Sequence, residues 1–220
     1  MSLILSIETA TKVCSVALHT KAQLIVTQTL YVEKSHAESL LHTIEYLLAA
    51  SPYTKKDLTA IAISSGPGSY TGLRIGAATA KGLCYALGLP LISINTLEAM
   101  AYGMYPYNTS QARLCPMLDA RRMEVYYLLA APQGHMLVEP QVMFVRADSF
   151  QDWLAKGPVL FFGEGAAKCR SLWSRHTHAL FIENIYPEAH HVGLLAYVKF
   201  QQAFFEDLIH FSPLYLKPFQ

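Results

Sequence analysis

The sequence has 220 residues, of which 52% are hydrophobic and 15% are charged, and its formal net charge is +1. Charged residues make up about a quarter of a typical soluble protein, so this chain has more apolar residues than usual. These residues either fill a large core or form a surface that a partner protein buries. The longest runs of basic residues are the pairs Lys55-Lys56 and Arg121-Arg122. The sequence therefore has no basic stripe of the kind found in proteins that bind nucleic acid without a partner.

The four cysteines are widely spaced and form no Cys-x-x-Cys pair. This pattern is typical of a reducing compartment rather than of a disulfide framework or a zinc site. The N-terminus has no basic lead and too short an apolar stretch for a signal peptide, and no run approaches the roughly 18 apolar residues of a membrane helix. We therefore expect a cytoplasmic protein that makes no contact with a membrane.

The first half of the chain alternates between apolar strand patterns and helical patterns. The expected strands cover residues 3–7, 13–19, 23–30, 58–64 and 91–94. The expected helices cover residues 35–50 and 71–87, and another helix begins at residue 96. Ser35 is predicted to cap the first helix, with Glu38 completing a capping box.

A polar, aromatic segment at residues 102–111 predicts a boundary between two domains, residues 1–106 and 107–220. The expected strands of the second half cover residues 113–118, 124–130, part of 135–145, 159–162 and 180–182. The expected helices cover residues 148–155 (capped by Asp148), 165–174 and 187–210. Each half thus predicts an α/β unit of three strands, helix, strand and helix, which is ribonuclease-H-like. Two such units make the actin/sugar-kinase/Hsp70 (ASKHA) superfold.

The run Glu8-Thr9-Ala10-Thr11 follows the first strand. Kinases and ATPases of this superfold carry an acidic residue there, which helps to hold Mg²⁺, followed by small residues that meet phosphate oxygens. Here the acid is Glu rather than the usual Asp, which changes the position of the carboxylate. An ordinary turn at the end of a strand is the competing interpretation, and this motif alone favours it.

The run Gly66-Pro67-Gly68-Ser69 lies between a strand and a helix. The free N–H groups at a helix N-terminus attract anions, so this loop is a candidate phosphate site together with Thr9 and Thr11. It matches neither the Walker A loop nor the G-x-G-x-x-G fingerprint. Residues 163–166 form a second glycine turn, for which an ordinary strand-to-helix turn is the favoured interpretation.

Residues 66–76, GPGSYTGLRIG, closely resemble the TsaB (YeaZ) family, which bacteria need to make threonylcarbamoyladenosine in tRNA. The segments that also resemble this family are residues 5–18, 35–41 (SHAESLL), 118–126 (LDARRMEVY) and 213–217 (PLYLK). The resemblance spans nearly the whole chain and is densest before residue 130. It implies the ASKHA fold and a non-catalytic adaptor in the complex that modifies adenosine 37 of tRNA.

The resemblance also implies partners and cofactors. The partners are a TsaD-type catalytic paralogue, a TsaE-type ATPase and, through the complex, tRNA; a homodimer is an alternative when the chain is alone. The resemblance implies that this chain has no cofactor of its own and that the complex uses ATP and Mg²⁺. A nucleotide bound at a subunit interface is one arrangement that it allows. TsaD-type proteins bind a metal through two histidines that are one helical turn apart. In this chain the residue one turn after His36 is Leu40, and His42 lies nearly on the opposite side of the helix from His36. We therefore expect no metal site and no catalytic residue.

The helices at residues 35–50 and 71–87 are the predicted partner surface. The first is apolar on more than one side, and Gly72, Gly76 and Ala80 in the second suit close helix packing. The predicted interface residues are His36, Ser39, Leu40, Thr43, Tyr46, Leu47, Gly72, Ile75, Gly76, Thr79, Ala80 and Leu83. Two alternatives remain open: both helices belong only to the core, or the chain is a small ATP-dependent kinase-like enzyme. Protease activity is not expected, because the chain has no H-E-x-x-H or G-x-S-x-G motif.

Overall fold

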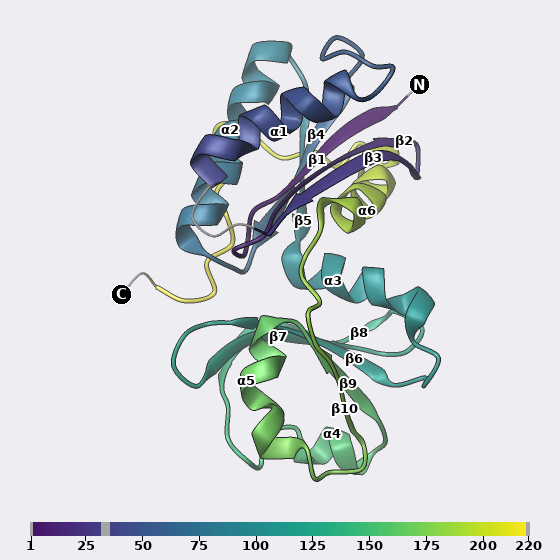
Figure 1. The fold of residues 1–220 in the computed structure, drawn as a ribbon, viewed down its shortest axis with the longest axis vertical. Coiled ribbons are helices and arrows are strands. Elements are labelled where there is room, and N and C mark those ends of the chain that lie inside the picture. The colour runs from purple at the N-terminus through teal and green to yellow at the C-terminus, as the bar shows by residue number, and fades with distance from the viewer. Residues whose placement is uncertain (1, 32–35, 219–220) are drawn as a thin grey trace. The chain divides into compact units, whose positions relative to one another are not determined.

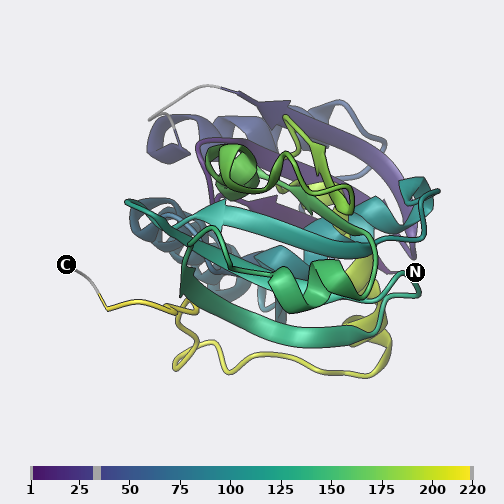
Figure 2. The ribbon, with the colours of Figure 1, turned by 90° about the horizontal axis from the view of Figure 1, so that it is seen from below.

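The computed structural model describes residues 2–31 and 36–218, which fold into two compact units (Figures 1 and 2). Unit 1 comprises Met1–Ala99 and Pro187–Leu214, and unit 2 comprises Met100–Tyr186 and Tyr215–Gln220. Each unit contains a five-stranded mixed sheet, and the two sheets have equivalent strand orders. The predicted α/β fold of two ribonuclease-H-like units is confirmed.

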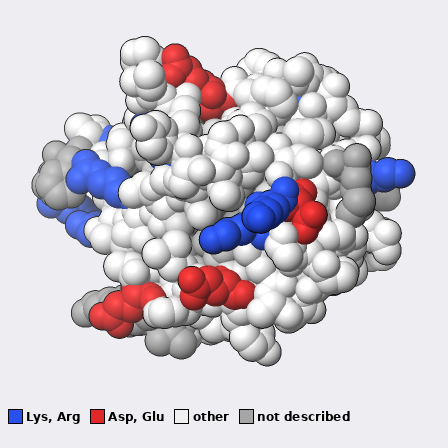
Figure 3. Space-filling model, turned by 90° about the horizontal axis from the view of Figure 1, so that it is seen from above, with Lys and Arg blue, Asp and Glu red and all other residues white. Residues whose placement is uncertain are grey.

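Few charged groups lie on the face of the molecule that Figure 3 draws. Figure 3 shows small clusters of both signs among uncharged atoms on the face that it draws. Within residues 2–31 and 36–218, no helix combines the length and the apolar character that crossing a membrane requires.

The sheet of unit 1 has the order β3-β2-β1-β4-β5. Its strands are β1 (Leu3–Glu8), β2 (Cys14–Thr20), β3 (Gln23–Leu30), β4 (Ala60–Gly66) and β5 (Leu91–Asn95). The pairs β1–β2 and β2–β3 are antiparallel, whereas β4 is parallel to both β1 and β5. β3 is therefore an edge strand.

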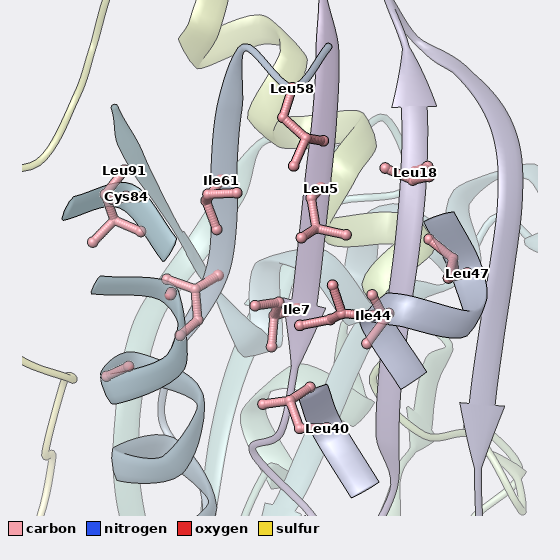
Figure 4. Close-up of a cluster of buried hydrophobic side chains, with 14 of the residues drawn as sticks. Leu5, Ile7, Leu18, Leu40, Ile44, Leu47, Leu58, Ile61, Cys84 and Leu91 are labelled. Carbon is pink, nitrogen blue, oxygen red and sulfur yellow. The ribbon is translucent and has the colours of Figure 1, made fainter. Parts of the chain in front are cut away.

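Three helices cover the two faces of this sheet. α1 (His36–Ala49) and α2 (Tyr70–Leu87) pack on one face, and α6 (Ala189–Gln201) packs on the other. The alternation of side chains along β1 produces both contacts. Leu5 and Ile7 join the cluster under α1 and α2 (Figure 4), whereas Ile4 joins the cluster under α6.

Unit 2 repeats this topology with the order β10-β9-β6-β7-β8. Its elements are η1 (Tyr105–Tyr107), β6 (Arg113–Asp119), β7 (Glu124–Ala130), β8 (Met136–Phe144), α4 (Gln151–Ala155), β9 (Val159–Phe162), α5 (Glu164–Trp173) and β10 (Ala179–Ile182). An aromatic cluster fills the core, with the ring of Phe150 5.2 Å from that of Phe161 and 5.3 Å from that of Trp173. α3 (Thr96–Met104) begins in unit 1 and ends in unit 2.

The C-terminal segment corrects the predicted domain boundaries. Residues 187–214 belong to unit 1, because α6 covers a sheet face whose apolar residues would otherwise meet water. The first boundary lies after Ala99 rather than after residue 106. The helix expected over residues 187–210 ends at Gln201, and Glu206 then forms a bridge to Leu91 at the edge of the sheet.

Two predicted helix starts have different outcomes. Asp148 does not cap α4; that helix begins at Gln151, after Phe150 in the left-handed region (φ 64°), with no side-chain cap. The predicted cap of α1, Ser35, lies outside the described residues.

All four cysteines are buried, free thiols. Burial raises the pKa of Cys14 to about 11 and that of Cys84 to about 12, so both thiols are protonated at neutral pH.

A buried histidine explains the glycine in the middle of α6. A Cβ at Gly193 would lie 2.1 Å from Nδ1 of His19, which is fully buried on β2. Neither ring nitrogen of His19 has a hydrogen-bond partner among the described residues. Burial, assisted by His190 and His191, lowers the pKa of His19 to about 4, and burial and His190 lower the pKa of His191 to about 4.

The free energy of unfolding should therefore fall as the pH drops below about 6.5 and level off below about 4, because the unfolded chain binds protons that the folded chain excludes. Each histidine contributes at most roughly 3 kcal/mol. Urea unfolding at several pH values should show a smaller acid loss for His19→Leu than for the parent. His42→Gln, at an exposed position, is the control. An equal acid loss in parent and His19→Leu would contradict this assignment.

Candidate functional site

The two predicted loop motifs lie against each other in unit 1. The N–H of Ser69 donates to the carbonyl oxygen of Ala10 at 2.6 Å. A Cβ at Gly68 would lie 2.3 Å from the same oxygen, so only glycine fits there without displacing the backbone. The structure therefore brings the run 8–11 and the run 66–69 together, as a phosphate site would require.

The first turns of α2 pack closely against the loop that follows β1. A Cβ at Gly72 would lie 2.1 Å from the carbonyl oxygen of Thr9, and a Cβ at Gly76 would lie 2.3 Å from Oγ1 of Thr9. The Thr9 hydroxyl donates to the carbonyl oxygen of Gly72 at 2.9 Å. Gly72 and Gly76 therefore permit close packing within unit 1, which corrects the prediction that they admit a partner helix.

The other polar groups of this site also have internal partners. Oγ1 of Thr11 accepts from the N–H of Val13 at 3.2 Å. Ser69 caps α2, since its Oγ accepts from the N–H of Gly72 at 3.3 Å. These bonds give each hydroxyl a structural role, and the phosphate-site assignment stays a prediction.

The C-terminal segment closes one side of the glycine loop. The N–H of Leu214 donates to the carbonyl oxygen of Ser65 at 2.7 Å. Gly66 has a φ of 109° and precedes Pro67 through a cis peptide bond. A Cβ at Gly66 would lie 2.8 Å from the carbonyl oxygen of Leu214. The backbone of the C-terminal segment therefore occupies the space beside the loop at this position.

Glu8 is a fully buried carboxyl at the end of β1. Its Oε1 accepts from the N–H of Ala10 at 2.6 Å, whereas its Oε2 has no partner among the described residues. Burial raises the pKa of Glu8 to about 7, despite hydrogen bonds that act in the opposite direction. The neutral form of this carboxyl is therefore much more stable near neutral pH than that of an exposed glutamate.

His36 connects α1 to the same loop. Its Nε2–H donates to the carbonyl oxygen of Thr11 at 2.7 Å, and its side chain is buried. His42 is exposed and lies 3.8 Å from Glu45. Among the residues that the structure describes, no three His, Cys, Asp or Glu side chains form a group suited to a metal ion.

Burial divides the predicted interface residues into three groups. The buried ones, which offer a partner little or no surface, are His36, Leu40, Thr43, Leu47, Gly72, Gly76 and Ala80. The half-buried ones are Ser39, Ile75, Thr79 and Leu83. Tyr46 is 66% exposed. The first group corrects the prediction, because these residues form the side of each helix that packs inside unit 1.

A second line of small residues lies on the outer side of α2. Ala78, Gly82 and Ala86 are exposed and follow the same four-residue spacing as the buried line. A Cβ at Gly82 would meet nothing within 4 Å. Leu41 of α1 is 53% exposed, and Ile75 of α2 is half-buried. We call Leu41, Ile75, Ala78, Gly82 and Ala86 the α1–α2 face; the small residues predicted for the interface, Gly72, Gly76 and Ala80, form the buried line instead.

A separate open groove of about 420 Å³ lies between α1 and the edge strand β3. Its lining residues are Gln28, Leu30, Glu38, Ser39, His42, Thr43 and Tyr46. The predicted residues Ser39, Thr43 and Tyr46 therefore face this groove. Leu41 lies on the other side of α1, toward α2, because helical spacing turns it away from Ser39 and Tyr46.

The second glycine turn, at residues 163–166, is explained by packing in unit 2. A Cβ at Gly163 would lie 2.3 Å from the carbonyl oxygen of Met117, and one at Gly165 would lie 2.7 Å from that of Leu118. Both glycines allow the start of α5 to approach β6.

Two ribonuclease-H-like units with equivalent sheet orders define a protein of the ASKHA superfold. The family model described as TsaD, tRNA N6-adenosine threonylcarbamoyltransferase, matches residues 25–219. The chain belongs to the TsaB family: it is 32% identical over 165 residues to the Bacillus subtilis tRNA threonylcarbamoyladenosine biosynthesis protein TsaB, covering 73% of this chain and 70% of that protein.

Two further comparisons, one with a relative and one with a solved structure, agree with membership of this family. Escherichia coli TsaB is 38% identical over 124 residues, which cover 56% of this chain and 53% of that protein, so the match spans about half of the relative's length. The solved structure of YeaZ from Pseudomonas aeruginosa superposes with a TM-score of 0.80 at 26% identity, covering 98% of this chain and all of that one.

Gly76→Ala should lower the free energy of unfolding by about 1–3 kcal/mol, because the new methyl group collides with Oγ1 of Thr9. In a Thr9→Ala background the same change should cost less, since the colliding atom is gone. Gly82→Ala, on the outer side of the same helix, should stabilise the chain by up to about 1 kcal/mol. Urea unfolding measures all four variants, and equal effects of the two glycine changes would contradict the packing described.

Glu8→Gln should be more stable than the parent above pH 7, by at most roughly 3 kcal/mol, and similar to it near pH 4. Because the pKa of Glu8 is raised, the stabilising contribution of this one group is lost as the pH rises from about 4.5 through about 7. His19 and His191 act in the opposite direction, so the difference between variant and parent is the informative quantity. Glu45→Gln, at an exposed position, is the control. An unchanged pH profile for Glu8→Gln would refute the assignment.

Proposed function

We propose that this chain is a non-catalytic adaptor of the complex that attaches the threonylcarbamoyl group to adenosine 37 of tRNA. In this proposal it binds the TsaD-type catalytic subunit through the α1–α2 face. The exposure of this apolar face in the isolated chain is the observation that carries the proposal, since membership of the TsaB family gives the pathway but not the contact.

The shape of the face favours a helical partner. Ala78, Gly82 and Ala86 form a line of small exposed residues along α2, beside the exposed Tyr85, and along this line the backbone of another helix can approach closely. Leu41 and Ile75 flank this line with larger apolar groups. Two helices from a TsaD-type subunit would complete a four-helix contact, and a second copy of this chain is the alternative occupant when the catalytic subunit is absent.

The chemistry of unit 1 supports an adaptor rather than an enzyme. The hydroxyls of Thr9, Thr11 and Ser69 have partners in their own unit. His36 has no second histidine one turn later, because Leu40 occupies that position and is buried. We propose that ATP and Mg²⁺ are used by the complex with a TsaE-type ATPase, that tRNA binds through the complex, and that this assembly works in the cytoplasm.

Gly82→Gln should leave the fold intact, because the site is open and glutamine favours a helix, yet block a partner helix. Leu41→Glu should place an unpaired charge in the contact. Each change should weaken binding of the TsaD-type subunit at least about 100-fold, or about 2.7 kcal/mol, as measured by calorimetry. Thermal midpoints should stay within a few degrees of the parent.

Two controls separate this face from other surfaces. Tyr46→Glu tests the groove beside β3, and Leu172→Glu adds the same charge at an exposed leucine of unit 2. Both should leave binding within a few-fold of the parent. Normal binding by Gly82→Gln and Leu41→Glu would overturn the proposal, and a loss with Tyr46→Glu alone would move the contact to the groove.

A further inference from the structure

The turn between β6 and β7 holds two adjacent arginines in an unusual backbone conformation. Arg121 has a φ of 67° and Arg122 a φ of 49°, a left-handed region that glycine and asparagine adopt more readily. Both arginines are exposed. The backbone conformation of the turn therefore does not favour arginine at either position.

A lysine from α5 fixes one side of the turn. Nζ of Lys168 donates to the carboxylate of Asp119 and to the carbonyl oxygens of Arg122, at 2.9 Å, and Glu124. The same carboxylate accepts from the N–H of Arg121 at 2.8 Å. One ammonium group thus ties together the two strands and the turn between them.

A second lysine, from the C-terminal segment, fixes the other side. Lys217 forms an ion pair with Glu124, and its Nζ lies 3.4 Å from the carbonyl oxygen of Ala120. Two segments that are distant in the sequence therefore support one short turn. Such support is more than a solvated loop needs, and it holds the two arginine backbones in place.

The charges around the turn leave the two arginines uncompensated. Lys168 is paired with Asp119, and Lys217 is paired with Glu124. Across residues 2–31 and 36–218, no ion pair joins the guanidinium group of Arg121 or Arg122 to a carboxylate. The turn therefore presents two positive groups on a supported backbone.

We propose that Arg121 and Arg122 bind phosphates of the tRNA backbone when the chain acts in its complex. This inference rests on the function proposed above and names the tRNA contact of this subunit. A guanidinium group binds phosphate oxygens through paired N–H donors, and phosphate contacts position an RNA without reading its sequence. The other adjacent basic pair, Lys55-Lys56, has flexible ammonium groups instead of guanidinium forks.

The test uses the assembled complex with the TsaD-type subunit and an unmodified transcript of a tRNA that carries adenosine 37. Arg121→Gln combined with Arg122→Gln should weaken tRNA binding about 10- to 100-fold at moderate salt. The slope of log affinity against log salt should decrease by about 1–2, since two phosphate contacts are lost. Arg121→Lys with Arg122→Lys should keep most of the slope, because the charges remain.

Two controls exclude general effects. Lys55→Gln with Lys56→Gln makes the same change in net charge at the other basic pair and should alter the slope by less than half as much. Arg121→Gly with Arg122→Gly removes both side chains while suiting the left-handed backbone, so it should lose tRNA affinity without losing thermal stability.

The outcomes separate this inference from the proposed function. An unchanged salt slope in an intact complex, or equal losses for the arginine and lysine pairs, would overturn the inference alone. Loss of TsaE-type ATPase binding with unchanged tRNA binding would assign the turn to an acidic protein surface and would also overturn it. Failure of the unaltered chain to form the complex would instead reject the proposed function.

Discussion

The close approach of α2 to the loop after β1 is the constraint on which the rest of unit 1 depends. The carbonyl and hydroxyl oxygens of Thr9 occupy the space that side chains at positions 72 and 76 would need. Because both positions are glycine, α2 can lie against the loop, and its rotation about its own axis is fixed. His36 holds α1 to the same loop through Thr11, so one short segment positions both helices.

The fixed rotation of α2 determines which residues remain outside. The buried line of small residues serves packing, and the line through Ala78, Gly82 and Ala86 becomes surface beside Leu41. The apolar surplus of the composition is thus divided between a core on both faces of the sheet and an exposed helical face. In unit 2, the equivalent topology supports a different feature, a turn that lysines hold and that presents charge rather than apolar surface.

Local patterns were sufficient to predict the elements and their order. Residues 23–30, 124–130 and 159–162 were expected as strands and coincide with β3, β7 and β9. Contacts between distant segments were not predictable in this way. The return of α6 to unit 1 has no local signal in the sequence, because it depends on packing against residues such as Ile4 on a distant strand. The sequence also does not indicate which of the two equally spaced lines of small residues in α2 is buried, because that depends on contact with Thr9. The glycine at position 193 in α6 also lacks a local cause, because the ring of His19 that requires it lies on a distant strand.

Hydrogen–deuterium exchange of the chain, alone and with the purified TsaD-type subunit, tests the central claim most directly. The account predicts slower exchange in the partner-bound state across α1 and α2, mainly around Leu41 and from Ile75 to Ala86, with unit 2 unchanged. Slower exchange confined to unit 2 or to β3, with α1 and α2 unaffected, would contradict it.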